Sequence, residues 1–205
     1  MPLLWKGGVA VCIGGGPSIK NKQIDAVAEA HRQGKCYVIA INNSYQIAPY
    51  AEVVYGCDRI WWQWHKDEVQ HHHGLKLTIS RNAALKYDWV TWIRGEATSN
   101  GLSKKSDYIV NGEIGGYQAI NLAVNFGATK VLLIGYDMRN IKGVSHWHGD
   151  HPNRQRPYWG TRIKHFKNML PDLKERNIKV INCSPGSALD AFPMGDLEKE
   201  LSNRG

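Results

Sequence analysis

Apolar residues along the chain gather in short runs that alternate with amphipathic segments. Short apolar runs bounded by glycine or polar residues are typical of buried strands, and they occupy residues 8–14, 36–42, 51–58, 75–80, 129–137 and 178–184. Apolar positions at helical spacing predict helices at 20–34, 59–73, 115–127 and 160–177. Because strands alternate with helices, we expect an α/β fold with a mostly parallel sheet and helices on both faces.

Two stretches lack this regular alternation. Within the less regular residues 81–113, residues 88–95 predict a further strand. Residues 99–107 predict a loop, because Ser, Asn, Gly and Lys side chains are costly to bury. Residues 139–160 are polar and His-rich, and we expect them to form an active-site loop. No internal repeat or low-complexity linker divides the 205 residues, so we expect one domain over 1–205.

Charge and cysteine content narrow the class of protein. The formal net charge of +8 suits an anionic partner such as a nucleotide, a nucleic acid or an acidic glycan. Lys and Arg residues are scattered along the chain, so nucleic acid is not the favoured ligand. No apolar run approaches the roughly 18 residues of a membrane helix, and we expect a cytoplasmic protein without a membrane span. Reduced core thiols are expected for the four cysteines, Cys12, Cys36, Cys57 and Cys183.

Polar and glycine residues follow several of the predicted strands. Ligands of open α/β sheets bind beyond the carboxyl ends of the strands, near the point where the strand order reverses. The candidate nucleotide-binding residues at these ends are Gly14, Gly15, Gly16, Pro17, Ser18, Asn42, Asn43, Asp58 and Asp137. Their convergence on one sheet edge predicts a ligand site there.

The stretch GGGPS (14–18) has two interpretations. Its glycines allow close approach of backbone to a ligand, and the following helix presents free amides and a positive dipole end to a phosphate. Ser18 is then either a phosphate ligand or a helix cap. The alternative is a Gly-Pro corner with a Ser cap. The spacing is neither that of the Walker loop nor that of the dinucleotide motif GxGxxG, since Ile19 stands where the last glycine belongs.

The other strand ends also leave alternatives open. Asn42 and Asn43 either read a base or ribose edge or form a common turn. Asp58 either accepts from a ribose hydroxyl, holds a metal, or caps the helix that follows it. That helix carries three tryptophans, Trp61, Trp62 and Trp64, of which one or two can face the core. Core packing is favoured for them over stacking on a ligand.

The segment SHWHGDHPNRQRPYWG (145–160) is the richest polar cluster. It fits a metal site, a general base or a plain loop. The catalytic candidates are His148, Asp150 and His151, and the metal candidates are Asp137, His146, His148 and Asp150. Two arginines, Arg154 and Arg156, are candidates for contacts to a phosphate or an acceptor. The separate HHH at 71–73 is expected as a solvated helix end, favoured by the helix dipole.

Four stretches together carry a family resemblance: VCIGGGPSI (11–19), the Asn pair at 42–43, GGYQAINLAVNFGATKVLLIGYDM (115–138) and RIKHFKNMLPDLKERNIKVINCSPGSAL (162–189). They resemble a Rossmann-like superfamily that contains small bacterial CMP-sialic acid sialyltransferases, 6-hydroxymethylpterin diphosphokinase-like proteins and short phage-encoded relatives. The resemblance covers most of the chain in the same order. It implies a single-domain Rossmann-like fold that binds a nucleotide.

The resemblance also implies roles for individual residues. Gly16, Pro17 and Ser18 match the family's nucleotide loop, and Asn43 matches an Asn that contacts the nucleotide in the sialyltransferases. Two positions depart from the sialyltransferase pattern: Gly15 stands where those enzymes have a loop Asn, and Gly115 where they have a Ser that contacts the nucleotide. Gly115 and Gly116 are also candidate nucleotide-binding residues. The stretch that matches the family's catalytic His is RPYWGT (156–161), which has no His. The base of a transfer reaction is therefore sought at His148 or His151.

These observations favour a nucleotide-dependent group transferase, of glycosyltransferase-like type, that uses a nucleotide-sugar. A diphosphokinase of the hydroxymethylpterin type is an alternative, and it requires Mg²⁺, for which Asp58, Asp137 and Asp150 are the candidate ligands. A second alternative is a protein that binds or sequesters a nucleotide without turning it over. A third is a nucleic-acid modifying or binding protein, suggested by the charge of +8 and the Trp and Tyr content.

Overall fold

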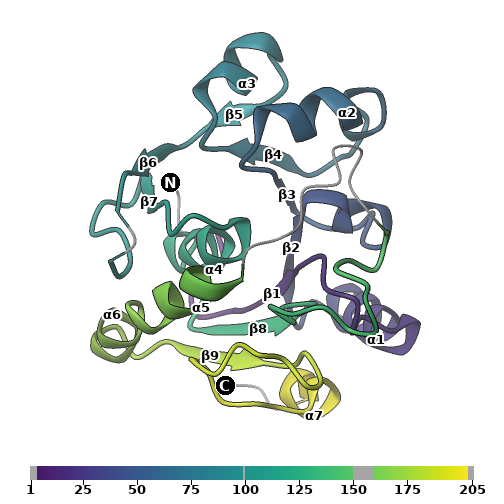
Figure 1. The fold of residues 1–205 in the computed structure, drawn as a ribbon, viewed down its shortest axis with the longest axis vertical. Coiled ribbons are helices and arrows are strands. Elements are labelled where there is room, and N and C mark those ends of the chain that lie inside the picture. Colours follow the sequence, from purple (N-terminus) through teal and green to yellow (C-terminus); the bar gives the residue numbers. More distant parts are fainter. Residues whose placement is uncertain (1–3, 99, 150–158, 203–205) are drawn as a thin grey trace.

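A seven-stranded sheet in which every pair of neighbours is parallel runs through the protein (Figure 1). The computed structural model describes residues 4–98, 100–149 and 159–202. The sheet order is β5-β4-β3-β2-β1-β8-β9. Its strands are β1 (Val9–Ile13), β2 (Tyr37–Ile41), β3 (Val53–Tyr55), β4 (Leu75–Thr78), β5 (Thr91–Trp92), β8 (Lys130–Ile134) and β9 (Lys179–Asn182). Six of the seven predicted strands are present, and the predicted strand at 88–95 is divided between β5 and β6 (Arg94–Glu96), which lies in a separate two-stranded sheet. The Rossmann-like α/β fold is confirmed.

Helices cover both faces of this sheet (Figure 1). One face carries α4 (Gly115–Asn125), α5 (Gly160–Lys167) and α6 (Leu170–Glu175). The other carries α1 (Asn21–Arg32), α2 (Arg59–Val69), α3 (Arg81–Lys86) and α7 (Leu197–Ser202). A short 3₁₀ helix, η1 (Asn42–Gln46), follows β2. In the part of the chain that the structure describes, no helix combines the length and the apolar character needed to cross a bilayer.

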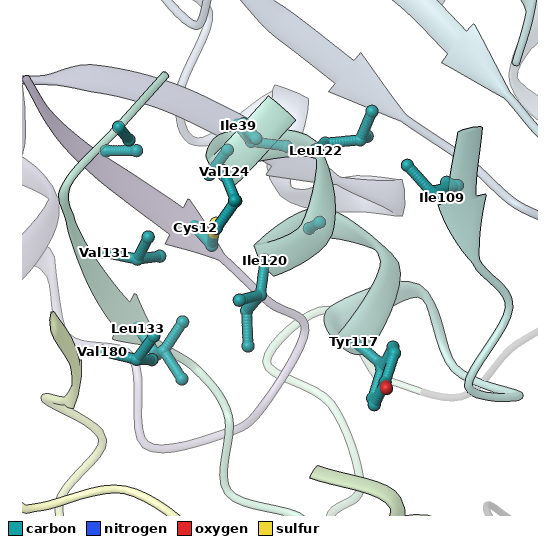
Figure 2. Packing of buried hydrophobic residues seen from close by; sticks show 14 of the residues in the cluster. Cys12, Ile39, Ile109, Tyr117, Ile120, Leu122, Val124, Val131, Leu133 and Val180 are labelled. Atoms are coloured by element: carbon teal, nitrogen blue, oxygen red, sulfur yellow. The ribbon is translucent and has the colours of Figure 1, made fainter. Parts of the chain in front are cut away.

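Alternation along each strand builds the two cores. On β1, Cys12 packs into the cluster under α4, whereas Val11 and Ile13 pack into the cluster under α1 and α2. Figure 2 shows Ile120 of α4 together with side chains of the strands on the first of these faces. Burying one such aliphatic side chain contributes about 1.5–3 kcal/mol. Because the side chains on both faces of such a strand pack into an apolar core, the strand is a continuous apolar run in the sequence.

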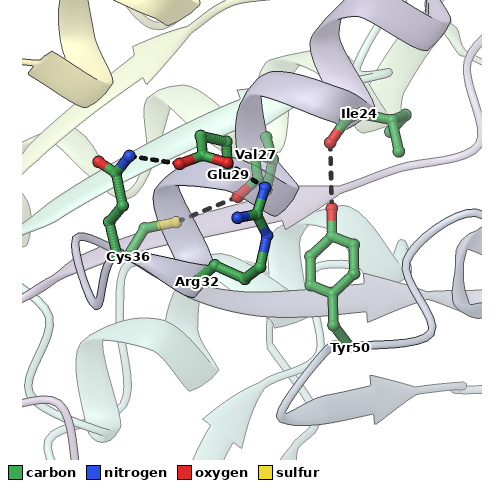
Figure 3. Close-up of polar contacts among 7 residues, drawn as sticks. Ile24, Val27, Glu29, Arg32, Cys36 and Tyr50 are labelled. Atoms are coloured by element: carbon green, nitrogen blue, oxygen red, sulfur yellow. Dashed lines mark hydrogen bonds and ion pairs between the residues drawn. The ribbon is translucent and has the colours of Figure 1, made fainter.

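Two carbonyls of helix α1 accept hydrogen bonds from residues that precede β2 and β3 (Figure 3). The Tyr50 hydroxyl donates to the Ile24 carbonyl at 3.2 Å, and the Cys36 thiol donates to the Val27 carbonyl at 3.9 Å. Burial raises the pKa of Cys36 to about 12, so the thiol keeps the proton that it donates. All four cysteines are free thiols; three are buried and Cys57 is half-buried.

Two predicted helices end differently from the sequence pattern. The predicted helix at 160–177 is two helices, because Pro171 lies in the first turn of α6, where its missing N–H leaves no helical bond unmade. The predicted helix at 59–73 ends at Val69, so the three histidines at 71–73 follow it. Trp61 and Trp62 are both buried, which confirms the core packing expected for this helix.

The segment predicted as a loop at 99–107 is partly buried, which corrects the expectation that its composition would keep it in solvent. Leu102 and Ser103 are buried against α4. The buried Asn121 side chain of α4 accepts from the amides of Ser103 at 3.1 Å and Val110 at 2.8 Å. It thereby holds the loop and a small parallel sheet, β6 (Arg94–Glu96) with β7 (Tyr108–Val110), against the helix.

We expect Asn121→Ala to lower the free energy of unfolding by about 2–4 kcal/mol, since two buried amides lose their acceptor. Urea denaturation monitored by circular dichroism measures the loss. The matched control is Asn82→Ala, which removes an exposed asparagine from α3. Equal stability of the two variants would contradict the role given to Asn121.

Candidate functional site

A cavity opens at the carboxyl ends of β1, β2 and β8. The strand order reverses between β1 and β8, and this switch point is where ligands of α/β sheets bind. The cavity holds about 660 Å³ of space not filled by protein atoms, part of it open to solvent. Its lining comprises Gly14, Gly15, Gly16, Ile41, Asn42, Asn43, Ile114, Gly115, Gly116, Gly135, Tyr136, Asp137, Met138, Ser145, His146, His148 and Trp159.

The structure brings most of the sequence candidates to this one cavity. Those that line it are Gly14, Gly15, Gly16, Asn42, Asn43, Gly115, Gly116, Asp137, His146 and His148. Pro17 and Ser18 follow the lining residue Gly16 in the chain and are not part of the lining. Asp58 is exposed at the N-cap of α2, where its side chain makes no capping hydrogen bond, and it does not line the cavity. Four candidates lie outside the described residues: Asp150, His151, Arg154 and Arg156.

The glycine loop approaches the end of β8 more closely than any side chain permits. A Cβ at Gly14 would lie 2.6 Å from the Gly135 carbonyl oxygen. A Cβ at Gly16 would lie 2.6 Å from that same oxygen and 1.8 Å from Asp137 Oδ2. Two of the three glycines are therefore required by contact with the protein itself, whatever ligand the cavity takes.

The loop amides are mostly used within the protein. Gly14 N donates to the Ile134 carbonyl and Gly16 N to the Gly135 carbonyl, each at 2.8 Å. Ser18 donates to Asp137 Oδ2 through its backbone N at 3.2 Å and its Oγ at 3.0 Å. These bonds favour the interpretation of residues 14–18 as a corner over that of a phosphate cradle, because Asp137 accepts both donors of Ser18.

Asp137 is the main electrostatic feature of the cavity. Its residue is 1% exposed, and burial raises the pKa of its carboxyl, although the hydrogen bonds from Ser18 act in the opposite direction. The second oxygen, Oδ1, is buried and has no hydrogen-bond partner among the described residues. A buried acceptor without a partner is costly, so this oxygen suits a ligand that presents a hydroxyl, an amino group or a cation.

Two asparagines at the end of β2 present opposite groups. Asn43 Oδ1 accepts from Trp61 Nε1 at 2.8 Å. Because an indole nitrogen only donates, this bond fixes the amide orientation and leaves the Asn43 NH₂ group as the donor on the cavity side. Asn42 has φ of 51°, a left-handed conformation that Asn tolerates. Its buried Oδ1 has no partner within the described ranges.

The start of α4 is the donor end of the cavity. Ile114, at the N-cap, supplies no side-chain cap, and the first turn holds no acidic residue. The first amides of a helix have no partner within the helix and carry the positive end of its dipole. Within the described residues, the amides of Gly115 and Gly116 make no hydrogen bond. An anion is therefore favoured here rather than at the loop of residues 14–18.

Two histidines cover the loop from the other side. The rings of His146 and His148 stack with centroids 5.1 Å apart, and a Cβ at Gly15 would lie 3.0 Å from His146 Cδ2. The Trp147 amide donates to the Gly15 carbonyl at 3.0 Å, which ties this segment to the loop. Among the described residues, no three His, Cys, Asp or Glu side chains come together to hold a metal ion.

Sequence reasoning missed several residues of the lining. Tyr136 lies under α4, where its hydroxyl donates to the Gly116 carbonyl at 3.0 Å. Met138 lines the cavity with a left-handed φ of 50°, and Trp159 has a buried Nε1 without a partner in the described part of the chain. Tyr136 and Met138 flank the candidate residue Asp137 in the sequence, and this position could have marked them as residues of the site. Nothing in the sequence pattern marks Trp159 as a residue of the cavity.

Comparisons with known proteins add little to this description. No protein-family model and no curated protein matches the chain. Among solved structures, it is similar to the enoyl-acyl carrier protein reductase of Bacillus cereus, solved with NADP⁺ and indole naphthyridinone. The identity is 16% and the TM-score 0.31, over 97% of this chain and 80% of that chain. A likeness this distant does not bear on the function of this chain.

We expect Gly16→Ala to destabilise the protein by about 1–3 kcal/mol, the usual cost of forcing an extra carbon into a packed region. The new methyl group meets Asp137 Oδ2 and the Gly135 carbonyl. Thermal denaturation measures the effect. Gly95→Ala is the control, because a Cβ there meets only Ile79, at an ordinary 3.5 Å. Unchanged stability of Gly16→Ala would show that the loop is not held against Asp137.

Proposed function

We propose that the cavity binds a nucleotide and that the protein uses it in group transfer, with a nucleotide-sugar as the favoured donor. One observation carries the proposal. A single cavity at the switch point combines the uncapped N-terminus of α4 with two buried acceptors that lack partners, Asp137 Oδ1 and Asn42 Oδ1. A nucleotide offers the matching set, an anionic phosphate together with hydroxyl and amino donors.

The distribution of donors and acceptors favours one orientation. The phosphate lies at the α4 terminus, near Gly115 and Gly116, where the helix dipole stabilises negative charge. The ribose hydroxyls or the base lie toward Asp137, whose charge would repel a phosphate. The Asn43 NH₂ group donates to a base or ribose oxygen. This places the phosphate opposite to the position that the loop of residues 14–18 suggests from sequence.

The transfer chemistry is assigned to His148 and to the donors at the start of α4. A sugar transfer needs a base that takes the proton of the acceptor hydroxyl, and His148 lines the cavity beside the glycine loop. The donors at α4 stabilise the charge that develops on the departing phosphate. The family resemblance of the sequence to sialyltransferase-like proteins supports this donor class over a free nucleotide.

The diphosphokinase alternative has less support. It needs Mg²⁺, which is held through one or two carboxylates together with substrate phosphates. Among the described residues that line the cavity, Asp137 is the one carboxylate. Asp58 does not line the cavity, and Asp150 lies outside the described residues. Binding of a nucleotide without turnover remains the second candidate, because Asp137 and α4 support binding independently of any base.

A thermal-shift screen tests the binding. Mononucleotides, CMP-, UDP- and ADP-sugars are compared with and without Mg²⁺. A ligand at a hundredfold excess over its Kd stabilises by about 2.7 kcal/mol, which raises Tm by roughly 5–10 °C in a chain of this size. The nucleoside without phosphate is the matched control and should give a smaller rise, because it leaves the α4 terminus without an anion. No shift with any nucleotide would overturn the proposal.

Turnover separates the transferase from a protein that only binds. The stabilising nucleotide-sugar is incubated with the protein, and release of the free nucleotide is followed by chromatography. Release that is lost in His148→Ala, with the thermal shift retained, supports group transfer. An intact nucleotide-sugar after prolonged incubation with a range of acceptor hydroxyls favours binding without turnover.

We expect Asp137→Asn to raise the Tm of the ligand-free protein at pH 7–8 by a few degrees. Burial raises the pKa of this carboxyl in the folded state. The native state therefore binds the proton more tightly than the unfolded chain does, and stability falls as the pH rises from the ordinary Asp pKa through the raised one. The Tm difference between Asp137→Asn and the unmodified protein should be full at pH values above the raised pKa and should vanish below the ordinary Asp pKa. Differential scanning calorimetry from pH 3.5 to 8 measures it.

The same variant tests the orientation of the ligand. Loss of a charged acceptor should weaken nucleotide binding about 10- to 100-fold, since hydrogen bonds to charged groups contribute about 1.5–3 kcal/mol. Isothermal titration gives the affinity. Tighter binding by Asp137→Asn would instead show that the phosphate lies against Asp137, which would reverse the proposed orientation.

A further inference from the structure

A ladder of alternating cations and aromatic rings lies at the β5 edge of the sheet, three strands away from the cavity. It consists of Arg81, Trp92, Arg94, Tyr108 and Lys105. The guanidinium carbons of Arg81 and Arg94 lie 5.8 and 6.0 Å from the Trp92 ring centroid. Arg94 lies 5.5 Å, and Lys105 Nζ 4.6 Å, from the Tyr108 ring centroid.

The ladder is ordered and accessible. Trp92 Nε1 donates to the Ile79 carbonyl at 3.3 Å, and Arg94 donates to the Tyr108 hydroxyl at 3.2 Å. After these contacts the Trp92 residue is still 42% exposed. It is the one exposed Trp, Tyr or Phe in the part of the chain that the structure describes. Burial of such a ring against a partner would remove a large apolar surface from water.

The charge of the ladder is positive. Arg81, Arg94 and Lys105 contribute three cations, and the neighbouring Lys104 is also exposed. Asp107 is the counter-charge, but it lies 3.9 Å from Arg94 with both side chains more than half exposed. An exposed pair at that distance contributes little and exchanges readily for another anion.

We propose that this ladder binds single-stranded nucleic acid. Proteins that hold single strands combine cations, which contact the phosphates, with aromatic rings, on which bases stack. Duplex does not fit as well, because its bases are already stacked and paired. The net charge of +8 strengthens the attraction of a polyanion to the whole surface, and the ladder supplies the stacking.

The ladder and the cavity are separate sites on one edge of the sheet. Trp92 pairs with Thr78 of β4, at the same end of the sheet as Ile41 of the cavity. Three strand spacings between β5 and β2 make roughly 14 Å. The proposal does not depend on what the cavity binds.

Fluorescence anisotropy of a labelled 15-nucleotide oligo-dT, titrated with the full-length protein at 50 mM salt, tests the proposal. We expect binding that weakens steeply with salt and a loss of about tenfold or more in Trp92→Ala, since stacking contributes about 1–3 kcal/mol per base. Trp92→Phe keeps a ring and should retain most of the affinity. Arg94→Ala removes a phosphate contact, so its affinity relative to that of the unmodified protein should fall further as the salt concentration is lowered.

Matched controls separate the ladder from general charge. Arg59→Ala removes an exposed cation of α2, and Leu85→Ala removes an exposed apolar side chain of α3; both should bind like the unmodified protein. Circular dichroism confirms that each variant is folded. Three results would each overturn the proposal: no binding at 50 mM salt, equal losses in Arg59→Ala and Trp92→Ala, or competition by duplex or dextran sulfate that matches unlabelled oligo-dT. Excess mononucleotide that leaves anisotropy unchanged shows that the cavity is not the site measured.

Discussion

The carboxylate of Asp137, buried against the glycine loop, is the contact on which the site depends. Its Oδ2 atom accepts both hydrogen bonds that Ser18 offers, across 119 positions of sequence. That contact holds the ends of β1 and β8 together and leaves no space for a side chain at Gly16. The loop of residues 14–18 therefore connects the ends of β1 and β8 structurally. Its conformation is explained by the protein's own acid before any ligand is considered.

The same contact divides the cavity into two electrostatic halves. Asp137 places negative charge, or a proton held by burial, at the β1 and β8 end. The start of α4 places the positive end of a helix dipole, with two amides that lack partners among the described residues, at the other. A ligand that has only anionic groups, or only hydrogen-bond donors, satisfies one half of the cavity. A ligand that carries both kinds of group satisfies both halves, and this is the physical basis for proposing a nucleotide rather than a simple anion.

The sequence predicts the parts of this arrangement that depend on local pattern. Doubly buried strands such as β1 and β8 read as apolar runs, and the glycines and asparagines that follow them lie at the edge where parallel strands end. Contacts between distant residues are not readable in this way. Nothing at Ser18 indicates that its two donors bond to Asp137, a residue 119 positions away. Nothing at Asn43 indicates that Trp61 fixes its amide. Burial of Ser103 likewise depends on Asn121, a distant partner that composition does not reveal.

The parallel topology explains why so much polar chemistry gathers at one edge. Strands β1, β3 and β4 of the main sheet point the same way, so the helices that follow them, α1, α2 and α3, begin at the carboxyl edge and add the positive ends of their dipoles there. These dipoles favour anions along this edge, and the cations beside Trp92 add positive charge at β5. Asp137 opposes that field at one point. A uniformly positive edge would hold any phosphate in any orientation, whereas one buried carboxylate within it would repel the phosphate of the proposed nucleotide locally and direct the rest of that ligand toward itself.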